Sequence, residues 1–155
     1  MNLFWTNRTR PTGLYRRPSR VCSNMIAEWA AQYVGIPFVE LGRERSPGVD
    51  CWGLVRLVYL EQYEIELPSY SYENCDNRTA NARIFSAEKE SKWRPVLAMT
   101  GSVVLFNVAS RVCHAGVVVG DGKFIHAEVG TGVIMERLQS AQWRNRIEGF
   151  YEHDD

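Results

Sequence analysis

Several features that would point to a partner or a compartment are missing from this chain of 155 residues. Lys and Arg together number 18, as do Asp and Glu, so the formal net charge is zero. A chain without net charge has no overall field that attracts nucleic acid or an anionic membrane. No apolar run approaches the roughly 20 residues of a membrane helix, and the start of the chain lacks the apolar core and cleavage site of a signal peptide. We expect synthesis in the cytoplasm, no membrane insertion and no nucleic-acid partner.

Cysteine is also sparse, with only Cys22, Cys51, Cys75 and Cys113. They form no C-x-x-C pair and no dense framework of the kind found in small secreted proteins, so we expect reduced thiols in a reducing compartment. A zinc set of Cys51, His114, His126 and Cys113 matches none of the familiar spacings, so we predict no metal. A metal cluster on Cys22, Cys75 or Cys113 is a further alternative, which colour and bound iron would reveal.

The charge that is present is unevenly distributed. Residues 1–24 carry five arginines and no acidic residue. This composition predicts a basic arm. The arm either extends along a partner protein or is a solvated terminus. Residues 25–155 are enough for one domain with its own core, because the whole chain is 45% hydrophobic. We predict an arm followed by a single globular domain.

Apolar spacing predicts three helices in the first part of the chain. The first covers 23–34, with Ser23 or Asn24 as its cap and Gly35 and Pro37 as its stop. The second starts at Cys51 and runs to about Gln62. The third, over 78–91, is polar.

From residue 101 the pattern changes to short segments rich in Val, Ile and Phe, separated by glycine turns. These segments are 101–108, 111–120, 122–129, 132–138 and 146–152, and they predict an antiparallel meander. Helices followed by a sheet around one core define an α+β fold.

The stretch "GVDCWGLVRLVY" places Cys51 at the start of the second helix. The positive end of the helix dipole stabilises a thiolate there, although a single cysteine is most often buried packing. A nucleophile also needs a base. His114 and His126 lie on two strands joined by a tight turn. A hairpin folded about Gly120 would set both imidazoles opposite each other on one face, where His126 could orient His114.

Three stretches together resemble the NlpC family of papain-like cysteine peptidases: "AAQYVGIPFVELGRERSPGVDCWGLVRLVY", "RPVLAMTGSVVLF" and "HAGVVVGDGKFIHA". The resemblance implies a papain-like fold, Cys51 as the nucleophile, His114 as general base and acid, and His126 as the residue that orients His114. It implies no cofactor. The implied reaction is hydrolysis of peptidoglycan stem peptides through a thioester.

The resemblance also implies substrate contacts at Phe38, Asp50 and Trp52. Phe38 stands where many relatives have an active-site tyrosine, and Ser102 replaces a common aspartate, which suggests a structural hydrogen bond. Trp52 follows the nucleophile where serine is common. The Cys-Trp-Gly-Leu start resembles versions of the family found in bacteriophage tail proteins.

This last feature suggests where the protein acts. We expect a peptidase of a phage tail tip, made in the host cytoplasm and carried in the virion, whose arm contacts neighbouring tail subunits. The alternative is a structural subunit of the tail tip or of tail assembly, which keeps the fold with an occluded or inactive site.

Overall fold

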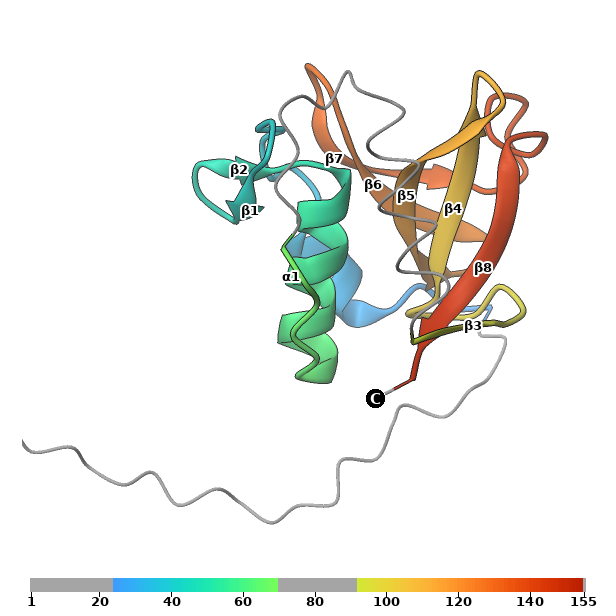
Figure 1. The fold of residues 1–155 in the computed structure, drawn as a ribbon, viewed down its shortest axis with the longest axis horizontal. Coiled ribbons are helices and arrows are strands. Elements are labelled where there is room, and N and C mark those ends of the chain that lie inside the picture. Colours follow the sequence, from blue (N-terminus) through green and yellow to red (C-terminus); the bar gives the residue numbers. More distant parts are fainter. Residues whose placement is uncertain (1–23, 70–91, 155) are drawn as a thin grey trace, which may run out of the picture.

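The computed structural model describes residues 24–69 and 92–154, and Figure 1 shows their arrangement. The predicted third helix over 78–91 and nearly all of the arm lie outside these residues. The elements in chain order are the 3-10 helix η1 (Glu28–Gln32), β1 (Arg43–Glu44), β2 (Gly48–Val49), α1 (Cys51–Tyr63), β3 (Trp93–Pro95), β4 (Val103–Val108), β5 (Arg111–Gly120), β6 (Lys123–Glu128), β7 (Gly132–Arg137) and β8 (Ile147–His153). Together they form an α+β fold, as predicted. Within the described ranges no helix has the length and apolar character needed to cross a bilayer.

The main sheet has the strand order β3-β8-β4-β5-β6-β7, with every pair antiparallel. All five predicted strands are present, but the prediction of a simple meander is wrong for the last one. Strands β4 to β7 form a meander, and β8 then returns to pair with β4 instead of β7. This return satisfies the backbone groups on the open side of β4, because the first strand of a meander has a free edge.

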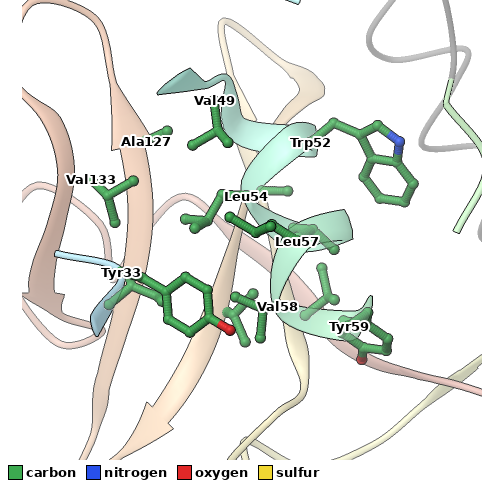
Figure 2. Packing of buried hydrophobic residues seen from close by; sticks show 14 of the residues in the cluster. Tyr33, Val49, Trp52, Leu54, Leu57, Val58, Tyr59, Ala127 and Val133 are labelled. Carbon is green, nitrogen blue, oxygen red and sulfur yellow. The ribbon is translucent and has the colours of Figure 1, made fainter. Parts of the chain in front are cut away.

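Helix α1 packs across one face of this sheet, mainly against β5 (Figure 1). Figure 2 shows the contact from close by, with Leu54 and Val58 of the helix directed towards the strand that carries Ala127. Both helix side chains are fully buried. Burying an aliphatic side chain of this size contributes about 1.5–3 kcal/mol. The core therefore holds α1, and with it Cys51, in a defined position beside the strands.

The first predicted helix is only partly correct. Residues 28–32 form a 3-10 helix, with i→i+3 hydrogen bonds from Ala30 N to Ala27 O and from Tyr33 N to Ala30 O. A start at Asn24 is prevented because the N–H of Ala27 donates to Val119 O of β5, which ties this segment to the sheet. The predicted stop is confirmed, since Gly35 takes a positive φ of 91° just beyond the helix.

The other face of the sheet has a smaller, more aromatic core. Its buried members are Val104, Phe106, Val118, Phe124, Leu138 and Trp143. Trp143 belongs to the connection between β7 and β8, which folds back over this face. The rings of Phe106 and Trp143 lie 4.7 Å apart between centroids. This face also carries the two histidines singled out in the sequence.

Candidate active site

Helix α1 begins at Cys51, as the sequence predicted. Asp50 is the N-cap: its backbone is extended, and its side chain accepts a hydrogen bond of 2.6 Å from the N–H of Gly53. A capping carboxylate pairs with one of the N–H groups that a helix start leaves without an intrahelical acceptor. Cys51 is therefore held in the first turn, half-buried, with the positive end of the helix dipole beside its thiol.

The loop before the helix reinforces this cap. Arg43 of β1 donates through Nη1 to Asp50 Oδ1 at 2.7 Å and to the carbonyl of Gly42 at 2.8 Å. The carbonyl of Gly42 also approaches Gly53 so closely that a β-carbon at Gly53 would overlap it. The glycine of the Asp-Cys-x-Gly motif is thus explained by packing between the loop and the first turn.

The two histidines lie together on the face of the sheet opposite α1. His114 Nε2 and His126 Nδ1 are 2.9 Å apart. The β5–β6 turn is centred on Asp121 and Gly122, both with positive φ, and not on Gly120 as expected. A bulge shifts the register between Val118 and Gly120, and the strands then pair Val117 with Ile125.

This register makes the histidines diagonal neighbours instead of directly opposed ones. Such neighbours on one face remain within reach of ring side chains. The predicted shared face and mutual contact of His114 and His126 are therefore present, although the expected geometry of the hairpin is corrected.

A third group, not predicted from the sequence, completes the histidine contacts. Glu136 of β7 accepts at Oε2 from His126 Nε2 at 2.5 Å and from the indole N–H of Trp143 at 2.8 Å. Glu128 Oε2 lies 3.7 Å from the same histidine nitrogen. The ligand atoms of His126, Glu128 and Glu136 lie within 4.8 Å of one another. Among the residues that the structure describes, these three bring together a nitrogen and carboxylate oxygens of the kind that can bind a metal ion.

Trp143 also covers both imidazoles. Its ring is stacked on His114, with centroids 5.6 Å apart and planes at 20°. It meets His126 nearly edge-on, at 5.0 Å and 75°. His126 is fully buried in this packing, whereas His114 stays half-buried and lines the pocket.

Burial controls the protonation of the pair. Desolvation, with a smaller contribution from the charge of His126, lowers the pKa of His114 from 6.5 to about 3. Desolvation also lowers the pKa of His126, against the opposing effects of the hydrogen bond and charge of Glu136 and the charge of Glu128. The resting form of His114 at neutral pH is consequently the uncharged imidazole, which is the form that can accept a proton.

Cys51 and His114 line one pocket of about 320 Å³. Phe38 and Asp50 line it too, so two of the three expected substrate contacts are at its wall, although the Asp50 carboxylate is already engaged with the helix cap and Arg43. The wall further includes Val108, Cys113, Ala127, Glu128, Val129, Gln142, Trp143 and Arg146.

Trp52 is placed differently. Its side chain is 2% exposed and donates from Nε1 to Pro68 O at 2.9 Å. Figure 2 shows its indole across the helix from Ala127, a residue of the pocket wall. The predicted substrate contact of Trp52 gains no support from this position and stays a prediction.

Two further sequence details have a structural explanation. Ser102 is buried, and its hydroxyl donates to Met99 O at 2.7 Å and accepts from Met99 N at 3.3 Å. This is the structural hydrogen bonding expected at that position. Cys113 is next to a β-bulge, since β4 pairs Phe106 with His114 but Asn107 with Val112. The bulge brings Cys113 into the pocket wall beside His114.

The residues that the sequence did not reveal are Arg43, Glu136 and Trp143. The position of Glu136 could have been predicted from its strand. It lies two residues from Ile134, which pairs with His126. Residues two apart on a strand share a face. Trp143 lies in the connection between β7 and β8, and Arg43 lies in the two-residue strand β1. Neither segment is long enough or regular enough to show a period, so only the folded chain brings these residues to the site.

The orientation of His114 decides which nitrogen can act in the pocket. Its Nε2 faces His126, which leaves Nδ1 as the nitrogen available to a thiol. A helix-start thiol and the imidazole of His114 line one pocket, and a second, buried imidazole contacts the first. Together with a helix packed against an antiparallel sheet, they define the papain-like class of α+β protein.

The chain belongs to the NlpC/P60 family, whose family model matches residues 35–152. The chain is similar to the murein DD-endopeptidase MepS/murein LD-carboxypeptidase of Escherichia coli K12, with 31% identity over 121 residues. It is also similar to the gamma-DL-glutamyl hydrolase of Bacillus subtilis, with 30% identity over 132 residues. The matches cover 78% and 84% of this chain but only 57% and 29% of those relatives. The chain thus spans between about a third and three fifths of their length.

Solved structures agree on the fold. The NlpC/p60 domain of the peptidoglycan hydrolase SagA matches with a TM-score of 0.53 and 25% identity, covering 78% of this chain and 89% of that one. An NLP/P60 family protein from Staphylococcus aureus matches with a TM-score of 0.59 and 21% identity, over 80% of this chain and 38% of that one. The papain-like fold expected from the sequence is confirmed.

Proposed function

We propose that the protein is a cysteine endopeptidase that hydrolyses amide bonds in peptidoglycan stem peptides. The observation that carries the proposal is that the helix-start Cys51 and His114 line the same pocket. The names of the relatives, a murein endopeptidase and a gamma-glutamyl hydrolase, support the substrate class. Glu128, Gln142 and Arg146 add polar groups to the wall that suit a substrate rich in carboxylates and amines.

The reaction follows from the roles of the two side chains. His114 Nδ1 takes the proton of Cys51, and the thiolate attacks the amide carbonyl carbon. The N–H of Cys51 at the helix start stabilises the oxyanion. The C–N bond breaks as the imidazolium protonates the leaving amine, which leaves a thioester. Water, deprotonated by His114, then attacks the thioester, so the acid product leaves and the thiol reforms.

We place this activity in a phage tail tip. The support is the Cys-Trp-Gly-Leu start of α1 and the arginine-rich arm of residues 1–24, which suits contact with neighbouring tail subunits. Antibody detection of the protein in purified phage particles tests this location. Its presence in lysate but not in particles would contradict it.

The experiment that tests the activity is digestion of purified peptidoglycan and of soluble stem peptides, with products identified by mass spectrometry. We expect cleavage by the wild type, none by Cys51→Ala, and retained cleavage by Cys113→Ala, which removes the other thiol of the pocket. Circular dichroism establishes that each variant is folded. No cleavage by a folded wild-type protein, together with slow alkylation of Cys51, would favour the structural tail subunit.

A further inference from the structure

Glu136 occupies a position that the proposed reaction does not yet use. It lies on β7, opposite Phe124 and one diagonal step from His126, and its side chain is 26% exposed. Its Oε2 receives two donors, His126 Nε2 and the indole of Trp143. An indole N–H can only donate, so Oε2 accepts from Trp143.

A carboxylate acceptor at residue 136 determines which ring nitrogen carries the hydrogen, first in His126 and then in His114. A carboxylate cannot donate, so Nε2 of His126 must carry a hydrogen. In a neutral imidazole the other nitrogen is then an acceptor, so Nδ1 of His126 accepts from Nε2 of His114 across the 2.9 Å contact. The hydrogen of His114 is thereby held on Nε2, and its Nδ1 keeps a lone pair.

We propose that Glu136 is a positioning residue for the His114–His126 pair, fixing both rings as the Nε2–H tautomer so that His114 Nδ1 keeps its lone pair and can act as a base in the pocket that Cys51 also lines. This inference deepens the proposed function and rests on it for the role of Cys51. Without an acceptor at residue 136, His126 can adopt either tautomer. In the Nδ1–H form it would turn His114 into its acceptor and place a hydrogen where the base is needed.

Glu136 also supplies charge where a cation forms. Proton transfer from the thiol makes His114 an imidazolium inside a site whose burial opposes that charge. His126 also faces His114 and, on its own strand, Glu128. Arg146 lies over Trp143, with its guanidinium 5.7 Å from the centre of that ring. Glu136 is the carboxylate in hydrogen-bond contact with His126, and Glu128 is 3.7 Å from it.

The first test is the tautomeric state of the histidines, measured by nitrogen-15 NMR on histidine-labelled protein at neutral pH in excess EDTA. We expect hydrogen on Nε2 of both His114 and His126 in the wild type. Glu136→Ala should give a mixture of tautomers at His126, and Glu136→Gln, which keeps an acceptor oxygen without the charge, should restore most of the Nε2–H form. Hydrogen on Nδ1 of His126 in the wild type would overturn the proposal without reference to any variant.

The second test is the rate of iodoacetamide alkylation of Cys51 against pH, read by peptide mass spectrometry. A change of one pKa unit in a thiol changes its thiolate fraction tenfold. We expect alkylation at pH 6 to slow about tenfold in Glu136→Ala, less in Glu136→Gln, and not at all in the matched control Glu28→Ala, an exposed glutamate on η1.

Neither readout needs a substrate, so the two proposals can fail separately. Suppose that the wild-type protein shows the expected tautomers and rapid alkylation of Cys51 but leaves peptidoglycan intact. This result would contradict the proposed substrate and would still support the role of Glu136. Unchanged tautomers and an unchanged alkylation profile in Glu136→Ala would contradict the role of Glu136, even in a protein that cleaves peptidoglycan.

Discussion

The thiol side and the histidine side of the site are built by different kinds of contact. On the thiol side, Arg43, Asp50 and Gly53 act on one another within a stretch of a dozen residues, through a helix cap and a close backbone approach. On the histidine side, His114, His126, Glu136 and Trp143 come from three strands and a connection. The position of the nucleophile therefore depends on local structure, whereas the position of the base depends on strand register.

The largest expected effect on activity comes from removing the general base, His114. His114→Ala should lower kcat about 10³-fold, because general base catalysis by a positioned imidazole contributes 10²–10⁴-fold. The measurement is turnover of a stem peptide at saturating substrate, with Cys51 alkylation as a second readout. Alkylation of Cys51 at the wild-type rate in this variant would show that the thiol is activated by the helix start alone.

The next effect concerns the residue that orients the base. His126→Ala should lower kcat about 10²-fold with little change in KM, because the substrate contacts remain while the ring of His114 loses its acceptor. His126→Asn should recover part of the loss, since its amide oxygen can accept from His114 Nε2. Full activity in His126→Ala would remove the orienting role.

On the thiol side, loss of the Asp50 cap should lower the stability of the protein. Asp50→Ala removes the N-cap and leaves Arg43, which is only 16% exposed, without its carboxylate, so we expect the free energy of unfolding to fall by about 2 kcal/mol. Asp50→Asn keeps a good cap and loses only the charge, so it should lose about half as much. Urea denaturation measures both. An equally stable Asp50→Ala would show that the core, and not the cap, positions the start of α1.

The smallest effect is on the histidine side and depends on pH. The folded-state pKa of His114 and that of His126 are both lowered by burial, so the unfolded chain binds protons first as the pH falls below about 6.5. The free energy of unfolding should therefore decrease on acidification. Between pH 6.5 and 5.5 the decrease is at most about 1 kcal/mol for each histidine, because the unfolded imidazole is already half protonated at pH 6.5.

The matched comparison for this pH dependence is His114→Asn. Between pH 5.5 and 6.5, the slope of unfolding free energy against pH should be shallower in this variant than in the wild type. Parallel slopes for the wild type and His114→Asn would contradict the lowered pKa of His114.

The accuracy of the sequence predictions follows the same division. The start of α1 at Cys51 was predictable because Asp50 precedes it as a cap and apolar spacing follows, all within one turn of chain. The first helix was less predictable, because a hydrogen bond from Ala27 to β5 decides where it begins. Apolar spacing carries no information about such a distant partner.

For the strands, the segments themselves were predictable from their composition, but the pairing was less so. Even spacing placed His114 and His126 on one face, while the bulge near Val118 changed their alignment. The pairing of β8 with β4 instead of β7 depends on which edge of the sheet remains open.

The α+β class, the capped nucleophile helix, the common face of the two histidines and the resemblance to the NlpC family could all be predicted from the amino-acid sequence. These features depend on residues that are neighbours in the chain or follow a regular period. That Glu136 and Trp143 join the histidine pair follows only from the tertiary structure. Hydrogen bonds and ring contacts between distant segments exist only after the strands have paired and the connection to β8 has folded over them.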